Sequence, residues 1–277
     1  MALNTSSYFS NSIQGIPGAG VDVDVTRADA APKYPMGFLI ERADGNRFRY
    51  CYVGTATNAG QLVGQTQASG GAVYGTPTVV ASASAVAVQA EYPILPGQVG
   101  SHWVQVTIAA IAANKYKGGY LVTTRGTGVG DTYRIIGNTA TGTPVSTDLY
   151  IQLAEPLKVA LTTITGLTIV TSPFNDLAAS ATTSTTCTGV LMSTTTAANL
   201  WAWVCTRGVV GCTEDATIPV TAGNQVAVSR NTAGSYAALA NNGTTVGTST
   251  SASPIVGYSV VVAGSSARQG AIMVQCE

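Results

Sequence analysis

Residues 189–277 constrain the fold of this chain more than any other part, because they consist of short β-type runs that each end at a turn. Apolar and β-branched residues alternate there with small polar ones at a period of two, as strands with one buried face require. Glycine or asparagine steps separate the runs and suit the tight turns of hairpins. The runs are 189–192, 200–206, 209–210, 217–220, 221–228, 254–262 and 269–276.

The scarcity of charge supports the same fold class for the whole chain. Only 9% of the residues are charged, against about 25% in average soluble proteins. Threonine and valine replace them, and branching at Cβ suits a pleated strand better than a helix. We therefore predict an all-β protein, made of β-sandwich or small β-barrel units with an extended N-terminal arm.

Breaks in composition divide the chain into five segments. A hairpin is predicted around Asp44-Gly-Asn46, and the apolar runs that follow end at prolines near residue 93. The turns at 58–63 and 221–226 share an Ala-Gly step, which suggests one β domain interrupted by another. The predicted segments are an arm (1–33), the first part of a β domain (34–90), an inserted β domain (91–178), a Thr/Ser-rich joint (179–188) and the C-terminal part of the first domain (189–277).

The arm contains the alternating run Val-Asp-Val-Asp-Val at 21–25. Because an extended segment of this kind can lie along a neighbouring subunit, Val21, Val23 and Val25 are candidate interface residues. A loose chain terminus is the simpler alternative.

The sequence offers little for catalysis, and we expect no enzyme, no cofactor and no metal site. His102 is the only histidine, and its position at a strand start favours a surface role. The glycine-rich run at 125–131 precedes a strand, whereas a phosphate loop needs a helix after it, so a hairpin loop is predicted. The acidic pairs Asp22/Asp24 and Glu214/Asp215 fit solvated turns or edges better than a glycosidase or a Ca²⁺ site.

Trp201 and Trp203 are the other candidate interface residues. Their spacing of two places both side chains on one face of a strand. A subunit interface or the edge of a core is favoured over a sugar-binding platform. The five cysteines have no Cys-x-x-Cys pair, so reduced thiols are expected; Cys205 and Cys212 could face each other across a hairpin at Arg207-Gly208.

Several phrases of the sequence resemble tailed-bacteriophage head decoration (cement) proteins. The C-terminal half carries a tryptophan strand followed by Arg-Gly, then Thr-Ala-Gly-Asn-Gln-Val and Pro-Ile-Val-Gly-Tyr-Ser. Similar virion-protein phrases occur at 36–50, 58–63, 114–122 and 132–136. The resemblance implies a capsid decoration protein that binds the major capsid protein on the outside of the head. A phage tail or fibre protein is the alternative, followed by a glycan-binding or glycan-degrading virion protein.

Charge also bears on partners and location. Thirteen basic and thirteen acidic residues give a formal net charge of zero, so no basic footprint for nucleic acid is expected. No membrane-spanning or secretory segment is predicted, and the expected location is the virion, after assembly in the host cytoplasm. Low charge leaves sheet edges unprotected, which predicts a homo-oligomer; the resemblance favours a trimer over a dimer.

Overall fold

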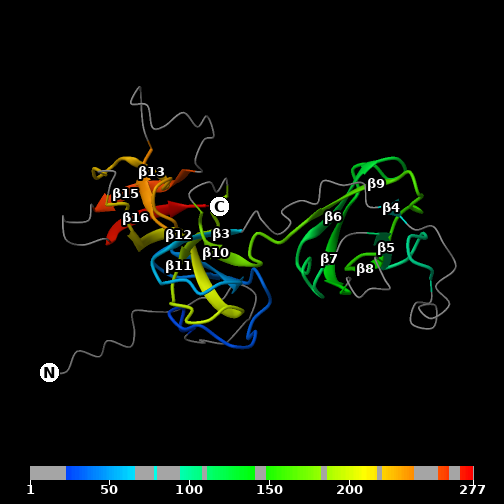
Figure 1. Cartoon of the computed structure of the whole chain (residues 1–277), viewed down its shortest axis with the longest axis horizontal. Helices are drawn as coiled ribbons and strands as arrows, with labels where there is room; N and C mark the ends of the chain where they lie inside the picture. Colours follow the sequence, from blue (N-terminus) through cyan, green and yellow to red (C-terminus); the bar gives the residue numbers. More distant parts are fainter. Residues whose placement is uncertain are drawn as a thin grey trace. The chain divides into compact units, whose positions relative to one another are not determined.

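The computed structural model describes residues 23–65, 78–79, 94–107, 111–140, 148–181, 186–216, 220–239, 255–261 and 269–276. Within these residues every regular element is a β-strand, so the all-β prediction is confirmed (Figure 1). No helix in this part of the chain has the length and apolar character needed to cross a membrane. The strands are β1 Leu39–Glu41, β2 Arg47–Val53, β3 Leu62–Gln65, β4 Thr78–Val79, β5 Trp103–Thr107, β6 Tyr120–Arg125, β7 Thr132–Asn138, β8 Asp148–Leu153, β9 Gly166–Val170, β10 Leu177–Ala179, β11 Gly189–Leu191, β12 Leu200–Thr213, β13 Gln225–Val228, β14 Tyr236–Ala238, β15 Ile255–Val261 and β16 Gln269–Gln275.

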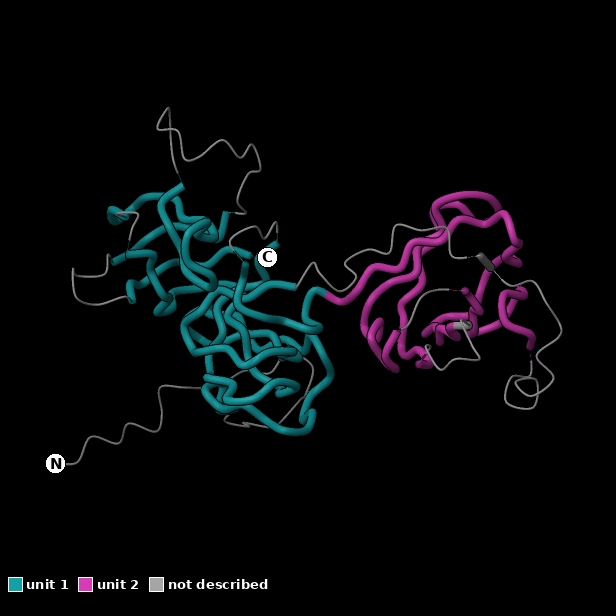
Figure 2. The backbone as a smooth tube through the Cα atoms, in the orientation of Figure 1, with its two compact units in different colours: residues 1–67, 173–277 teal, residues 68–172 magenta. Residues whose placement is uncertain are grey.

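The chain divides into two compact units (Figure 2). Unit 1 combines residues 1–67 with 173–277, and unit 2 is residues 68–172. The predicted insertion, 91–178, differs from unit 2 at both ends. At the first end, β4 pairs with β5 of unit 2, where Val79 lies opposite Val106. At the second end, β10 pairs with β2 and β3 of unit 1.

Five strands of unit 1 close into a barrel in the order β2-β10-β3-β11-β12. The ring closes because β12 also pairs with β2 over seven registered positions, from Leu200 opposite Val53 to Arg207 opposite Arg47. Alternate residues of these strands point inward and fill a small apolar interior. The interior residues are Cys51, Val53, Val63, Leu177, Leu191, Ala202 and Val204.

The strand β12 belongs to the barrel in its first half and to an antiparallel extension in its second half. Beyond a register shift between Cys205 and Arg207, it pairs with β16, and the order continues to β15, β13 and β14. The expected hairpin at Arg207-Gly208 is therefore wrong. Cys205 and Cys212 lie on one continuous strand, because a bulge absorbs the irregularity without reversing the chain.

A second apolar cluster holds the extension against the outside of the barrel. Leu62 of β3 and Val190 of β11 point outward from the barrel and pack into this cluster. Its other fully buried members come from the extension: Cys212, Val220, Val226, Val228, Tyr236, Val256, Ile272 and Val274. The barrel and the extension thus share one core on their common side.

The predicted turns of unit 1 are confirmed at three places. β1 and β2 form the hairpin expected around Asp44, whose carboxylate accepts the Asn46 N–H at 2.9 Å. The Ala-Gly steps both lie in turns directly before strands, with Gly60 before β3 and Gly223 before β13 at φ values of 78° and 85°. Only a residue that tolerates positive φ suits these positions.

The two strands that flank the insertion in the sequence pair with each other in unit 1. β3 precedes the inserted unit and β10 follows it, and these two strands pair antiparallel with Leu177 opposite Gln65. The barrel therefore closes across the point where the chain leaves and returns.

Unit 2 is a six-stranded antiparallel sheet in the order β4-β5-β8-β7-β6-β9. The glycine-rich run joins β6 to β7 as a hairpin loop, which confirms that prediction; Gly126, Gly128 and Gly130 all have positive φ. The core takes residues from β5, β6, β7, β8 and β9, together with two leucines of the chain between β8 and β9. Its principal members are Val104, Val106, Leu121, Tyr133, Ile135, Leu149, Ile151, Leu153, Leu157, Leu161, Leu167 and Ile169.

Candidate functional site

Trp201 and Trp203 lie together on the outer face of the barrel. Their neighbours in β12, Ala202 and Val204, point into the barrel interior, so the tryptophans point the other way. Across the strand pair, Trp203 lies opposite Tyr50 and Trp201 opposite Tyr52. The ring centroids of these pairs are 4.9 Å and 5.3 Å apart, within the range of favourable aromatic pairs.

Burial separates the roles of the two tryptophans. The Trp203 side chain is only 1% exposed, because the rings of Tyr34 and Tyr50 and the aliphatic part of the N-terminal segment cover it. Trp201 is partly exposed and stacks on Tyr50 with a centroid distance of 5.6 Å. From the sequence, a place in the core, in a subunit interface or in a sugar-binding platform was possible for both tryptophans. The structure places Trp203 in the core.

The N-terminal segment supplies the cover over this aromatic layer. Val23 and Val25 are 4% and 1% exposed and pack in the same cluster as Trp203. They pack in the core of their own chain, which leaves almost no surface of either side chain for a neighbouring subunit. The third candidate, Val21, lies outside the described residues.

Two backbone hydrogen bonds hold this segment in place. The Asp29 N–H donates to the Trp201 carbonyl at 2.7 Å, and the Trp201 N–H donates to the Asp29 carbonyl at 2.8 Å. Asp29 thereby continues the pairing of β12 on the side where β11 has ended. A sequence pattern of apolar alternation predicted an extended conformation here, but it carried no information about which surface the segment covers.

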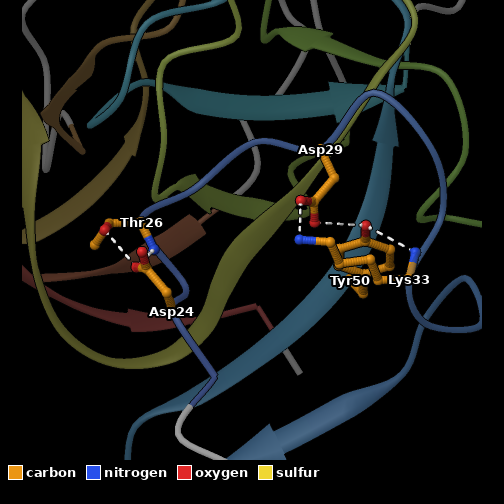
Figure 3. A network of polar contacts seen from close by, with 5 residues as sticks. All are labelled: Asp24, Thr26, Asp29, Lys33 and Tyr50. Atoms are coloured by element: carbon orange, nitrogen blue, oxygen red, sulfur yellow. Dashed lines mark hydrogen bonds and ion pairs between the residues drawn. The ribbon is translucent and has the colours of Figure 1, made fainter.

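A polar network at the edge of this layer is shown in Figure 3. The Tyr50 hydroxyl donates to the Asp29 carboxylate at 3.0 Å and accepts the Lys33 N–H at 3.3 Å. The Lys33 ammonium also reaches that carboxylate, with an Nζ–Oδ1 distance of 2.5 Å. These contacts hold the segment from Asp29 to Lys33 against the barrel.

The other acidic residue in Figure 3 is engaged locally. Asp24 accepts the hydroxyl and the N–H of Thr26 at 2.6 Å and 2.9 Å, and these two hydrogen bonds lower the pKa of the Asp24 carboxyl. Its predicted partner in an acidic pair, Asp22, lies outside the described residues.

The ionisation of Tyr50 makes the stability of unit 1 sensitive to alkali. Burial is the main reason that the pKa of Tyr50 lies above its usual value, and the hydrogen bond to Asp29 raises this pKa further. Because this pKa is higher in the folded state than in the unfolded state, the contribution of Tyr50 to the free energy of unfolding is fully present below about pH 10. The contribution is lost as the pH rises further, because the unfolded chain releases the proton first.

We therefore expect Tyr50→Phe to reduce this alkaline loss. At about pH 8 the variant should be less stable than the wild type by about 1 kcal/mol, the contribution of one hydrogen bond. At about pH 11 the difference should shrink or reverse, since phenylalanine cannot ionise. Urea unfolding at both pH values measures the difference in free energy of unfolding between the wild type and the variant. If this difference is the same at both pH values, Tyr50 does not titrate with unfolding.

For the second acidic pair, the prediction of a solvated turn is wrong, because both residues are buried. Glu214 and Asp215 are 8% and 1% exposed. Glu214 accepts the Tyr236 hydroxyl at 2.9 Å, and Asp215 accepts the hydroxyl of Ser229. The pair is buried because β14 runs beside it, a contact between residues too distant in sequence for local patterning to reveal.

Groups suited to catalysis or metal binding are dispersed over the described residues. His102 is exposed, as predicted, with its Nδ1 3.1 Å from the Leu153 carbonyl. Among the residues that the structure describes, no group of three or more histidine, cysteine or acidic side chains is close enough to hold a metal ion.

The strongest candidate for a binding surface is an apolar face of the extension, which we call the β16 face. It is formed by the residues of three neighbouring strands that point away from the core: Val209 and Gly211 of β12, Ala271 and Met273 of β16, and Tyr258 and Val261 of β15. Val209, Met273 and Tyr258 form one row across the sheet, and Gly211, Ala271 and Val261 form the next.

The β16 face is open to solvent. Val209 is 47% exposed, Tyr258 39% and Val261 57%. On the other side of the same strands, Cys212, Ile272 and Val274 are buried in the core. Apolar side chains that stand together on a sheet surface are typical of a contact with another protein.

Sequence reasoning missed the β16 face for a local reason. β15 carries a register shift between Ser259 and Val261, so its apolar residues do not alternate cleanly between the two sides. An amphipathic period of two was the only signal available, and the bulge interrupts it.

In comparisons with known proteins, no protein-family model, no curated protein and no solved structure matches the chain.

Proposed function

We propose that the chain is a bacteriophage virion structural protein, a capsid decoration protein that binds the outer surface of the head. The observation that carries the proposal is the β16 face, an uncharged apolar surface on a rigid sheet. The phrases of the sequence that resemble head decoration proteins support the choice of partner. In this role the chain acts by contact and needs no catalytic group.

The physical basis is the burial of apolar surface. Removing apolar area from water contributes roughly 25 cal/mol per Å², and the strands already order the backbone of this face before binding, so the ordering cost falls on the side chains alone. The β16 face therefore favours association with a second apolar surface. The partners that we propose are the major capsid protein and further copies of this chain, with a trimer favoured.

Decoration stabilises a shell by mass action. A protein that binds the assembled head and not its separated subunits stabilises the assembly by RT ln(1 + [L]/Kd) per site. Many equivalent sites on one particle multiply this effect. The location that follows is the capsid surface of the virion, reached by assembly in the host cytoplasm.

We expect Tyr258→Asp to weaken association by tenfold or more, because the substitution places a charge within an apolar contact. Tyr120→Asp is the matched control: Tyr120 is also a strand tyrosine, 44% exposed, but it belongs to unit 2. Light scattering reports self-association, and cosedimentation with undecorated heads of the cognate phage reports head binding.

The result that contradicts the proposal is equal behaviour of the two variants in both measurements. Far-UV circular dichroism of each variant checks that the sheet is intact. If Tyr258→Asp reduces only self-association, the β16 face joins copies of the chain, and the head contact lies elsewhere.

A truncation that tests the N-terminal arm must spare the residues that pack on the barrel. Deleting residues 1–33 would remove Val23, Val25 and Asp29, which pack against or pair with the barrel, so it would destabilise unit 1 itself. A deletion that tests for an intermolecular arm must end before Val23.

A further inference from the structure

We propose that Cys187 and Cys276 form an intramolecular disulfide when the folded protein meets a small-molecule disulfide oxidant. All five cysteines are free thiols in the structure. The Cys187 and Cys276 sulfurs are nevertheless only 3.9 Å apart, although 89 residues separate them in sequence. Cys187 lies just before β11 and Cys276 just after β16. This inference is independent of the proposed function.

Both backbones are held where the thiols meet. The Cys276 N–H donates to the Thr206 carbonyl at 3.0 Å. Next to Cys187, the Thr188 N–H donates to the Val63 carbonyl at 2.8 Å, and the Thr188 hydroxyl donates to the Pro173 carbonyl at 3.0 Å. Rotation of the two side chains must therefore bring the sulfurs to the bonding distance of about 2.05 Å.

Access separates this pair from the other cysteines. Cys51, in the barrel interior, Cys205, in the aromatic cluster, and Cys212, in the second core, are all fully buried. Cys187 and Cys276 are partly exposed and only partly packed against the second core. These are the only two of the five cysteines with solvent-exposed surface, so oxidation from solvent is expected at this pair. Cys205 and Cys212 both lie near Cys276 and are the internal competitors.

The reaction is a thiol–disulfide exchange that balances without a further reactant. A thiolate of the pair attacks oxidised glutathione, forms a mixed disulfide and releases one glutathione thiolate. The second cysteine then displaces the other glutathione. The pair loses two electrons and two protons, and one oxidised glutathione becomes two reduced molecules.

The environment makes this exchange slow at neutral pH. The Cys276 thiol beside it, and then burial, raise the pKa of Cys187 well above its usual value. Because the thiolate is the attacking species, the exchange should accelerate as the pH rises. The disulfide is thus expected to form gradually and to persist.

The bond would tie the C-terminal strand to the barrel. β16 lies between β12 and β15, so its separation would divide the extension in two. A covalent link from Cys276 to the residue that precedes β11 closes a ring containing β11 to β16, and rings of this length give the unfolded chain much less freedom. Unfolding of unit 1 then requires either a reductant or a higher temperature.

The experiment uses the intact wild-type chain. After incubation with oxidised glutathione at about pH 8.5, thiols are blocked, the protein is digested without reduction, and mass spectrometry identifies linked peptides. We expect a Cys187–Cys276 linkage and a melting temperature higher by several degrees, roughly 5–15 °C. A reductant should reverse both changes.

Two variants test the assignment. Cys276→Ser should abolish the temperature shift, whereas Cys212→Ala should keep it, after allowance for its lower starting stability. If a variant fails to fold, peptide mapping of the wild type decides alone. Free thiols at both positions, glutathione adducts that do not resolve, or a Cys187–Cys212 linkage would each overturn the proposal.

Discussion

Replacing Trp203 by alanine is expected to lower the free energy of unfolding of unit 1 by about 3–5 kcal/mol, as for a large aromatic side chain removed from a core. The ring is 1% exposed and touches the rings of Tyr34 and Tyr50 and the N-terminal segment. Its loss leaves a cavity and also removes the surface on which Val23 and Val25 pack. Urea denaturation followed by circular dichroism measures the change.

Trp201→Ala is the control for this prediction. Trp201 has the same residue type on the same strand face but is partly exposed, so its truncation should cost clearly less than that of Trp203. If the two variants lose equal stability, or if Trp203→Ala melts like the wild type, the assignment of Trp203 to the core is wrong.

We expect the second large effect from a glycine in the extension. Gly257→Ala should lower the free energy of unfolding by about 3 kcal/mol or more. Gly257 has a φ of 156°, in a region that other residues rarely adopt, and an added Cβ would overlap the Met273 carbonyl oxygen of the paired strand. Strand β15 could accept a methyl group only by moving away from β16.

Gly211→Ala provides the matched comparison. Gly211 lies on β12 in the same sheet, and an added Cβ there would meet nothing within 4 Å. Because glycine costs conformational entropy in a strand, alanine should be neutral or stabilising by up to about 1 kcal/mol. The same substitution should thus change stability in opposite directions on the two strands that flank β16; a similar loss at both positions would contradict the explanation from contacts.

Local patterns predicted the fold where the structure is local. The hairpin β1–β2 follows from the turn residues around Asp44, the loop between β6 and β7 follows from its glycines, and the strand character of residues 200–206 follows from alternation. The all-β class itself follows from composition. None of these features depends on which strands pair at long range.

The remaining features depend on contacts that no local pattern encodes. Barrel closure pairs Val53 with Leu200, and Glu214 becomes buried through Tyr236. The continuation of β12 through Arg207-Gly208 depends on a bulge that resembles a turn in sequence. For the candidate site, alternation identified the tryptophans as a pair on one face but could not show that the chain's own N-terminal segment covers them.

The pairing of β3 with β10 holds together the two strands that flank unit 2 in the sequence. Gln65 and Leu177 lie opposite each other in adjacent strands, at the spacing of about 5 Å that is typical of paired Cα atoms. The hydrogen bonds of this ladder belong to unit 1 alone. We therefore expect that a different domain with adjacent termini could replace unit 2 while the barrel keeps these hydrogen bonds.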